Sequence, residues 1–169
     1  MLFRSLAGVD LVVVASGFVL RVVAGGVAAG IELSPPFLAV VAFASLFMVA
    51  GKRYSEMVEL GPDAGTRPSL ERYTASYLRF VWALSATVLI TTYCLWAFDI
   101  GQEQHDQTWS VISIVPFVIA VLRYAVDVDS GNGGEPEEIA LGDRVLQVLA
   151  LVWVATLTLA VYATGPVAA

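Results

Sequence analysis

Five long apolar stretches, separated by short polar connections, dominate this sequence. They lie at about residues 6–29, 36–50, 78–98, 109–126 and 145–163. A helix that crosses a bilayer needs roughly 20 mostly apolar residues, and all five stretches meet or approach that length. The second stretch is the shortest, and its helix could continue beyond Gly51. The pattern predicts an all-α integral membrane bundle of five transmembrane helices, with no second domain within residues 1–169.

The composition also favours a lipid environment. Hydrophobic residues make up 58% of the chain, charged residues only 14%, and the mean hydropathy is +0.78, whereas about a quarter of the residues in a soluble domain are charged. The only cysteine, Cys94, excludes a disulfide framework and a CxxC-type metal cluster. Orientation in a bilayer follows Lys and Arg rather than net charge, so the charge of −6 indicates no partner, and no nucleic-acid partner is expected.

Apart from Arg21, the basic residues lie only in or beside alternate connections. They are Arg4 before the first stretch, Lys52, Arg53, Arg67, Arg72 and Arg79 around the second connection, and Arg123 and Arg144 around the fourth. The first and third connections and the C-terminal tail contain no Lys or Arg. The positive-inside rule therefore predicts a cytoplasmic N-terminus, cytoplasmic loops at residues 51–77 and 127–143, and a C-terminus outside the inner (cell) membrane. We expect the active face to be cytoplasmic.

The second connection carries the residues best suited to chemistry. Its first part, GKRYSEMVEL, is compatible with a helix and is followed by Gly61-Pro62, a common helix stop. Lys52, Glu56 and Glu59 then share one helical face. They could hold a diphosphate and Mg²⁺, because Mg²⁺ takes one or two carboxylates together with phosphate oxygens. A solvated helix end with an internal ion pair is an equally good interpretation.

A basic and aromatic segment follows this turn. It contains Arg67, Arg72, Tyr73, Tyr77 and Arg79. These residues could bind phosphate groups at the membrane surface. Positive-inside anchoring alone would explain most of the arginines, so both interpretations stay open.

Arg21 lies well inside the first apolar stretch. A charge there costs a few kcal/mol or more unless it faces a cavity or a partner. Asp10, Gly17 and Arg21 fall on one helical stripe, which predicts a polar side facing the bundle interior. No acidic residue lies deep in another stretch, so we expect a backbone carbonyl, a lipid phosphate, water or a group outside the chain as the partner. Structural pairing is favoured over substrate contact.

The glycine-rich acidic segment DVDSGNGGEPEE begins at Asp127 and superficially resembles a Ca²⁺ loop. It lacks the oxygen ligand at the fifth position and the glycine at the sixth, so a solvated loop is expected. His105 is expected at the surface. Trp96 and Trp109 are expected near helix ends as interfacial anchors.

Three separated segments carry a family resemblance. FASLFMVAGKRYSEM, SLERYTASYLRFVWALSATV and LRYAVDVDSGNGGEPEEIALGDRVLQ resemble, in this order, the decaprenyl-phosphate (polyprenyl-phosphate) phosphoribosyltransferases of the UbiA prenyltransferase superfamily. The likeness runs from about Asp10 to the end of the chain. It implies an all-helical fold of nine transmembrane helices around a central cavity open to lipid. Residues 1–169 would then be the C-terminal half of that fold, with helices five to nine.

The resemblance implies a membrane transferase activity. The family transfers 5-phosphoribose from phosphoribosyl pyrophosphate to a long polyprenyl phosphate, with Mg²⁺, and supplies the arabinose precursor of cell-wall arabinan. The substrate-binding residues implied are Lys52, Arg53, Tyr54, Glu56, Arg67, Arg72 and Tyr73, and Glu56 is also a candidate metal ligand. Where the superfamily usually has two aspartates at i and i+4, this chain has Lys52 and Glu56. The lysine favours the phosphoribosyl branch over aromatic prenylation.

The family's first motif, Asn-Asp-x-x-Asp, occurs nowhere in this sequence, and the four preceding helices are missing. We therefore expect the chain to be inactive without an N-terminal half or an intact homologue, and its catalytic residues are unknown. Met1 directly precedes a matched stretch, which fits an internal start. Two alternatives stay open: a non-catalytic membrane module that binds polyprenyl phosphate or an intact transferase subunit, and half of a UbiA-type aromatic prenyltransferase.

Overall fold

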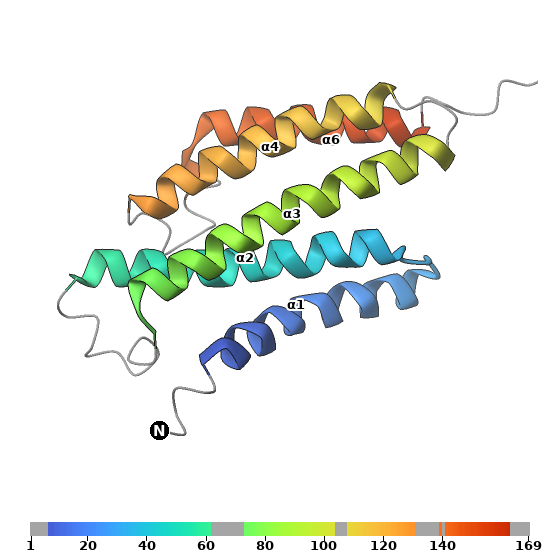
Figure 1. Cartoon of the computed structure of the whole chain (residues 1–169). Helices are drawn as coiled ribbons and strands as arrows, with labels where there is room; N and C mark the ends of the chain where they lie inside the picture. The colour runs from blue at the N-terminus through green and yellow to red at the C-terminus, as the bar shows by residue number, and fades with distance from the viewer. Residues whose placement is uncertain (1–6, 62–72, 104–107, 131–138, 140, 163–169) are drawn as a thin grey trace, which may run out of the picture.

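The computed structural model of the chain is a bundle of long helices (Figure 1), and it describes residues 7–61, 73–103, 108–130, 139 and 141–162. The helices are α1 (Ala7–Ala29), α2 (Pro35–Leu60), α3 (Ala75–Glu103), α4 (Thr108–Asp129) and α6 (Arg144–Tyr162). Each is long and apolar enough to cross a membrane, and the described residues contain no strand. The chain is a multi-pass membrane protein, as its hydropathy predicts.

Helices α2 and α3 extend well beyond the apolar stretches that predicted them. The α2 helix begins at Pro35, where the Phe37 amide donates to the hydroxyl oxygen of Ser34 at 3.4 Å. It continues through the polar residues to Leu60 and ends at Gly61, whose φ of 50° lies in the left-handed region that favours glycine. The predicted stop at this glycine is confirmed. Thr74 precedes α3 and accepts a hydrogen bond from the Tyr77 amide at 3.2 Å.

The five helices form an open arc, in which each helix packs mainly against its neighbours in the sequence. The contact between α2 and α3 is the most extensive, followed by that between α4 and α6. The α1 helix packs mainly on α2, so α1 and α6 lie on opposite sides of the bundle (Figure 1). One flank of the arc is therefore uncovered.

A stack of aromatic rings fixes α2 against α3. The Trp82 ring of α3 lies between two α2 rings, with its centroid 6.0 Å from that of Phe47 and 5.6 Å from that of Tyr54. Gly51 lies opposite the edge of this indole, because a Cβ atom placed there would be 3.1 Å from Trp82 Nε1. Glycine at this position allows the close approach of the two helices.

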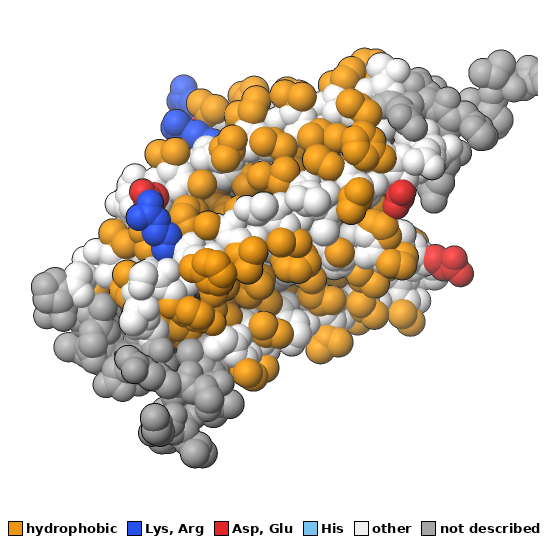
Figure 2. All heavy atoms as spheres, viewed as in Figure 1, with side chains coloured by type: hydrophobic (Ala, Val, Ile, Leu, Met, Phe, Trp, Pro, Cys, Tyr) orange, Lys and Arg blue, Asp and Glu red, His pale blue; other side chains and the backbone are white. Residues whose placement is uncertain are grey.

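The two ends of the bundle differ in their basic residues. Lys52, Arg53, Arg79, Arg123 and Arg144 lie at one end, here called the basic end, together with acidic residues such as Asp10 and Asp129. The opposite end has Glu32 and Asp99 and no described Lys or Arg. Figure 2 shows the blue side chains on one side of a mainly hydrophobic surface. The basic end corresponds to the side that the sequence predicts to be cytoplasmic.

Candidate functional site

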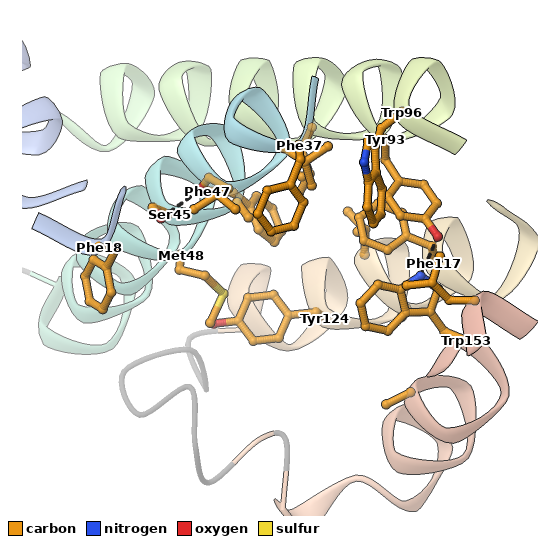
Figure 3. Close-up of a pocket in the computed structure, with 18 of the residues that line it drawn as sticks. Phe18, Phe37, Ser45, Phe47, Met48, Tyr93, Trp96, Phe117, Tyr124 and Trp153 are labelled. Atoms are coloured by element: carbon orange, nitrogen blue, oxygen red, sulfur yellow. Dashed lines mark hydrogen bonds between the residues drawn. The ribbon is translucent and has the colours of Figure 1, made fainter. Parts of the chain in front are cut away.

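An apolar cavity of about 800 Å³ lies within the bundle, and all five helices contribute to its wall (Figure 3). Its aromatic lining consists of Phe18, Phe37, Phe47, Tyr93, Trp96, Phe117, Tyr124 and Trp153. Aliphatic side chains supply most of the remaining wall. Such a cavity suits a hydrocarbon chain, because its wall offers close apolar contacts and few polar atoms.

The polar atoms at one end of the cavity are bonded to one another. Trp153 Nε1 donates to the Tyr93 hydroxyl at 2.6 Å, and that hydroxyl is 2.9 Å from the Ser113 hydroxyl. The Tyr93 ring also stacks on Phe117, with 3.8 Å between ring centroids. Figure 3 shows these aromatic residues grouped on one side of the cavity. This end of the cavity is a rigid aromatic wall that joins α3, α4 and α6.

A second cavity, of about 840 Å³, lies at the end of the bundle opposite the basic end. It shares Phe37 and Trp96 with the apolar cavity, and its wall includes Glu32 and Asp99. The Phe37 and Trp96 ring centroids are 5.4 Å apart, so this pair separates the two spaces. Trp96 lines both cavities and lies about two turns before the end of α3 at Glu103, beside Phe37 in the first turn of α2. Its role as an interfacial anchor stays a prediction.

Lys52 and Glu56 continue the cavity-lining face of α2 toward the basic end. Ser45 and Met48 line the cavity, and Lys52 and Glu56 follow Met48 at intervals of four residues on the same helical face. Lys52 is exposed and Glu56 is half-buried. Neither side chain pairs with another described residue, so the described residues do not form the internal ion pair of the alternative interpretation.

Arg53 and Tyr73 converge on Asp10 of α1. The Arg53 guanidinium is 3.2 Å from Asp10 Oδ2, and the Tyr73 hydroxyl donates to the same oxygen at 3.0 Å. Burial, then the hydrogen bond to Asp10, raises the pKa of Tyr73 to about 12. This cluster ties α1 and α2 to the segment before α3, and it shows that Asp10, with a side chain 38% exposed, faces α2. Substrate binding by Arg53 and Tyr73 stays a prediction.

Tyr54 faces the core and reaches α4. It is buried, and its hydroxyl donates to Asp129 Oδ1 at 3.1 Å. Arg79 Nη2 lies 3.9 Å from the same carboxylate oxygen. Asp127 and Asp129 belong to the last turn of α4 rather than to the expected solvated loop, because the glycines that end the helical pattern come only after them. A role for Tyr54 in substrate binding stays a prediction.

Asp143 joins α4 to α6 at the basic end. Its carboxylate accepts hydrogen bonds from Arg123 Nε at 2.7 Å and from the Val145 amide at 2.8 Å, which caps α6. The hydrogen bond from Arg123 lowers the pKa of Asp143. Each of the three ion pairs among the described residues thus joins two helices at the basic end. They fix the rim beside Lys52.

Asp127 is a candidate that the sequence analysis missed. It lies one turn beyond the cavity-lining Tyr124 on α4, and its Oδ2 is buried without a hydrogen-bond partner. Val128, the next residue, packs near Gly51, which places Asp127 at the level of Lys52. The signal was present in the sequence, because the helical spacing of the α4 residues Phe117, Tyr124 and Asp127 puts them on one side.

Arg21 lies within the span of α1 and lines the apolar cavity, with its side chain exposed on the uncovered flank of the bundle. Its guanidinium is 5.3 Å from the centroid of the Phe18 ring. No carboxylate of a described residue lies within ion-pair distance of it. An aromatic ring, which the sequence analysis did not consider, is therefore its neighbour within the described part of the chain.

The remaining expected site residues lie outside the described residues: Arg67, Arg72 and His105. The described part holds no group of three His, Cys, Asp or Glu residues that could bind a metal ion. Glu56 offers a single carboxylate in this part of the chain, and Mg²⁺ binding together with substrate phosphates stays a prediction.

No protein-family model matches the chain. Three curated proteins, each named decaprenyl-phosphate phosphoribosyltransferase, are similar to it. The identity is 56% with the protein of Corynebacterium glutamicum, over 91% of this chain and 47% of that protein. The identity is 53% with the protein of Mycolicibacterium smegmatis, over 92% of this chain and 52% of that protein. It is 55% with the protein of Mycobacterium tuberculosis, over 92% of this chain and 51% of that protein. The chain spans about half the length of these curated relatives, which supports the expected C-terminal fragment.

Proposed function

We propose that this homologue of decaprenyl-phosphate phosphoribosyltransferases forms part of a membrane transferase. The complete transferase would move 5-phosphoribose from phosphoribosyl pyrophosphate to decaprenyl or another polyprenyl phosphate. The observation that carries the proposal is the apolar cavity whose α2 wall leads to the unpaired Lys52 at the basic end. A polyprenyl phosphate has the same division into a long apolar chain and a charged head. The identity of 53–56% with relatives of that name supports the assignment.

The cavity would hold the isoprenoid chain, and Lys52 would hold a phosphate at the rim. Lysine is a compact charge on a flexible stem, which suits a phosphate oxygen. Lys52 lies one turn beyond the cavity-lining Met48, so a head group at this position stays continuous with a chain in the cavity. Asp127 would limit the space beside the phosphate and repel a wrongly placed anion.

In the proposed reaction, a phosphate oxygen of the lipid attacks the anomeric carbon of phosphoribose. The bond from that carbon to pyrophosphate breaks, and pyrophosphate leaves with the bonding electrons. Fixed cations such as Lys52 would stabilise the charge that develops on the phosphate oxygens. Mg²⁺ would neutralise the leaving pyrophosphate in the complete enzyme. Glu56 could supply one ligand to it, with the other ligands from outside the described residues.

The basic end would face the cytoplasm, and the complete enzyme would lie in the inner (cell) membrane. The distribution of Lys and Arg supports this orientation. Phosphoribosyl pyrophosphate is a soluble polyanion, so its site must open to water at the basic end. A role in the supply of arabinose for cell-wall arabinan rests on the family resemblance.

A transfer assay with two polypeptides tests the proposal. The chain is co-expressed with the half of the Corynebacterium glutamicum relative that it does not match, and membranes are given labelled phosphoribosyl pyrophosphate and decaprenyl phosphate. We expect labelled lipid from the pair and none from either polypeptide alone. No product from the pair would contradict the proposal, and co-purification with an intact transferase without a gain in activity would favour the non-catalytic module.

Variants of Lys52 test the site. We expect Lys52→Ala to lower transfer by the pair roughly 100-fold, as loss of a charge-stabilising donor typically does, and Lys52→Arg to retain part of the activity. Arg144→Ala is the matched control, because Arg144 is an exposed cation at the same end of the bundle. Full activity in Lys52→Ala would remove Lys52 from the site.

A further inference from the structure

Arg21 points toward the middle of the membrane. At a rise of 1.5 Å per residue, Arg21 lies about 12 Å from the end of α1 at Ala29 and farther from its start at Ala7. Its guanidinium lies over Phe18, one turn back toward the start of the helix, as helical side chains generally lean. Arg21 therefore does not extend to the nearer membrane surface.

No acidic residue in the described part of the chain lies at this level. Every Asp and Glu of the sequence lies in a connection or in the first or last turns of a helix. A second copy of the chain would have its acidic residues at the same levels, so it would not place a carboxylate beside Arg21 either. Lipid phosphates lie at the membrane surface. A carboxylate beside Arg21 at mid-span would therefore come from a different polypeptide segment.

Arg21 faces an uncovered part of the bundle. Residues of both α1 and α6 line the cavity, but these two helices make no substantial contact with each other. Figure 3 shows Phe18, the neighbour of Arg21, at the side of the cavity away from the aromatic wall. Arginines inside membranes almost always face a bundle interior or an aqueous cavity and pair there. The curated relatives are about twice as long as this chain, so a segment of suitable length exists.

We propose that Arg21 binds an Asp or Glu carboxylate at mid-span on a transmembrane helix, supplied by the polypeptide that corresponds to the other half of the relatives. This ion pair fixes the partner helix against α1, beside the apolar cavity. The inference rests on the proposed function only for the identity of the partner. It requires association of the two polypeptides and no transfer activity.

Association in vesicles tests the proposal. The chain and the unmatched half of the Corynebacterium glutamicum relative carry donor and acceptor fluorophores, and energy transfer is followed as the lipid dilutes them. We expect Arg21→Leu to weaken association tenfold or more, since truncating one partner of a buried charge pair has about that effect. Arg21→Lys should weaken it less. Arg144→Leu, the same type of change at the membrane surface, should leave it unchanged.

Two further measurements locate the carboxylate. Each Asp or Glu in the apolar segments of the partner is changed to Asn or Gln, and one such variant should match Arg21→Leu and give no further loss in combination with it. In the chain alone, Arg21→Leu should leave the thermal unfolding midpoint in detergent unchanged or higher, because it removes an unpaired charge. These results would support the proposal.

Several results would overturn it: no association of the unmodified polypeptides, full association of Arg21→Leu, no matching carboxylate in the partner, or a lowered unfolding midpoint for Arg21→Leu in the chain alone. The last result would mean that Arg21 has its partner within the chain. Association that depends on Arg21 but yields no phosphoribosyl transfer would overturn only the proposed function.

Discussion

The Asp10 carboxylate accepts hydrogen bonds from Arg53 and Tyr73, which come from different parts of the sequence. Arg53 is mostly buried, so Asp10→Ala would leave its charge without this acceptor. We expect the variant to lower the free energy of unfolding by about 1–3 kcal/mol, and Asp10→Asn to lower it less, because an amide oxygen can still accept from Tyr73. Thermal unfolding in detergent measures both. Glu32→Ala at the opposite end is the control. An unchanged free energy of unfolding for Asp10→Ala would show that the cluster adds no stability.

The Tyr73 phenol should lose its proton at a higher pH than an ordinary tyrosine does. Its pKa of about 12, against the ordinary 10, means that the folded state favours the neutral phenol. The resulting stabilisation is complete below pH 10 and is lost as the pH rises from 10 toward 12. The difference in phenolate absorbance between the wild-type chain and Tyr73→Phe reports this group alone. A midpoint near pH 10 for that difference would contradict a hydrogen bond from the neutral phenol to Asp10.

Neighbouring residues of α2 show what the sequence could predict about the site and what it could not. Lys52 and Glu56 were recognised because their spacing puts them on one face. The family resemblance implies the neighbours Arg53 and Tyr54 as well, but successive helical residues point in different directions. Arg53 therefore reaches Asp10, and Tyr54 reaches Asp129. The partners lie on α1 and α4, and no local pattern reveals which helix faces which residue.

At the scale of elements, the existence of the helices could be predicted better than their ends. Each apolar stretch became a helix, because hydropathy and length decide whether a segment crosses a membrane. The ends depended on local polar chemistry instead. The residues 51–60 continue α2, Thr74 caps α3, and Asp127 and Asp129 extend α4. Hydropathy cannot detect such polar helical turns.

The contact between α2 and α3 depends on a glycine that touches an immobilised indole. A Cβ atom at Gly51 would be 3.1 Å from Trp82 Nε1, and Trp82 is held between Phe47 and Tyr54. We expect Gly51→Val to lower the free energy of unfolding by about 1–3 kcal/mol through overpacking. Gly51→Ala should lower the free energy of unfolding less, because its smaller clash is partly offset by a gain of about 1 kcal/mol in helix propensity over glycine. Thermal unfolding in detergent measures the changes.

A second glycine supplies the control for this prediction. A Cβ atom at Gly17 of α1 would meet no atom within 4 Å, so Gly17→Ala should keep the propensity gain without a clash. Its unfolding midpoint should equal or exceed that of the wild-type chain. Equal stability of Gly51→Val and Gly17→Ala would show that α2 and α3 adjust without cost.

At the scale of the whole molecule, the arc of helices surrounds a space that no single element contains. The sequence predicts a bundle, and the family resemblance implies a cavity, but its wall comes from residues of all five helices. Phe37, Tyr93 and Trp153 are individually ordinary apolar-span residues. Their assembly into one wall depends on the relative rotation of α2, α3 and α6, which pairwise packing sets. The cavity residues therefore could not be predicted one by one.

This cavity should limit the binding of a long isoprenoid. Ala44 of α2 and Ala150 of α6 both line it, so Ala44→Phe and Ala150→Phe would fill part of the space. Under the proposed function, we expect each variant to bind less decaprenyl phosphate than the wild-type chain, because the added phenyl ring occupies space that the isoprenoid would otherwise fill. A much shorter prenyl phosphate should be less affected, because it needs less of the cavity.

The measurement is the amount of each lipid that the purified chain retains after reconstitution and re-extraction, quantified by mass spectrometry. Val13→Phe is the control, because Val13 is an exposed residue of α1 outside the cavity wall. Equal loss of the long and short lipids would place the obstruction at the phosphate rim near Lys52 rather than in the cavity. Unchanged retention of decaprenyl phosphate in both filled variants would mean that the isoprenoid does not occupy this cavity.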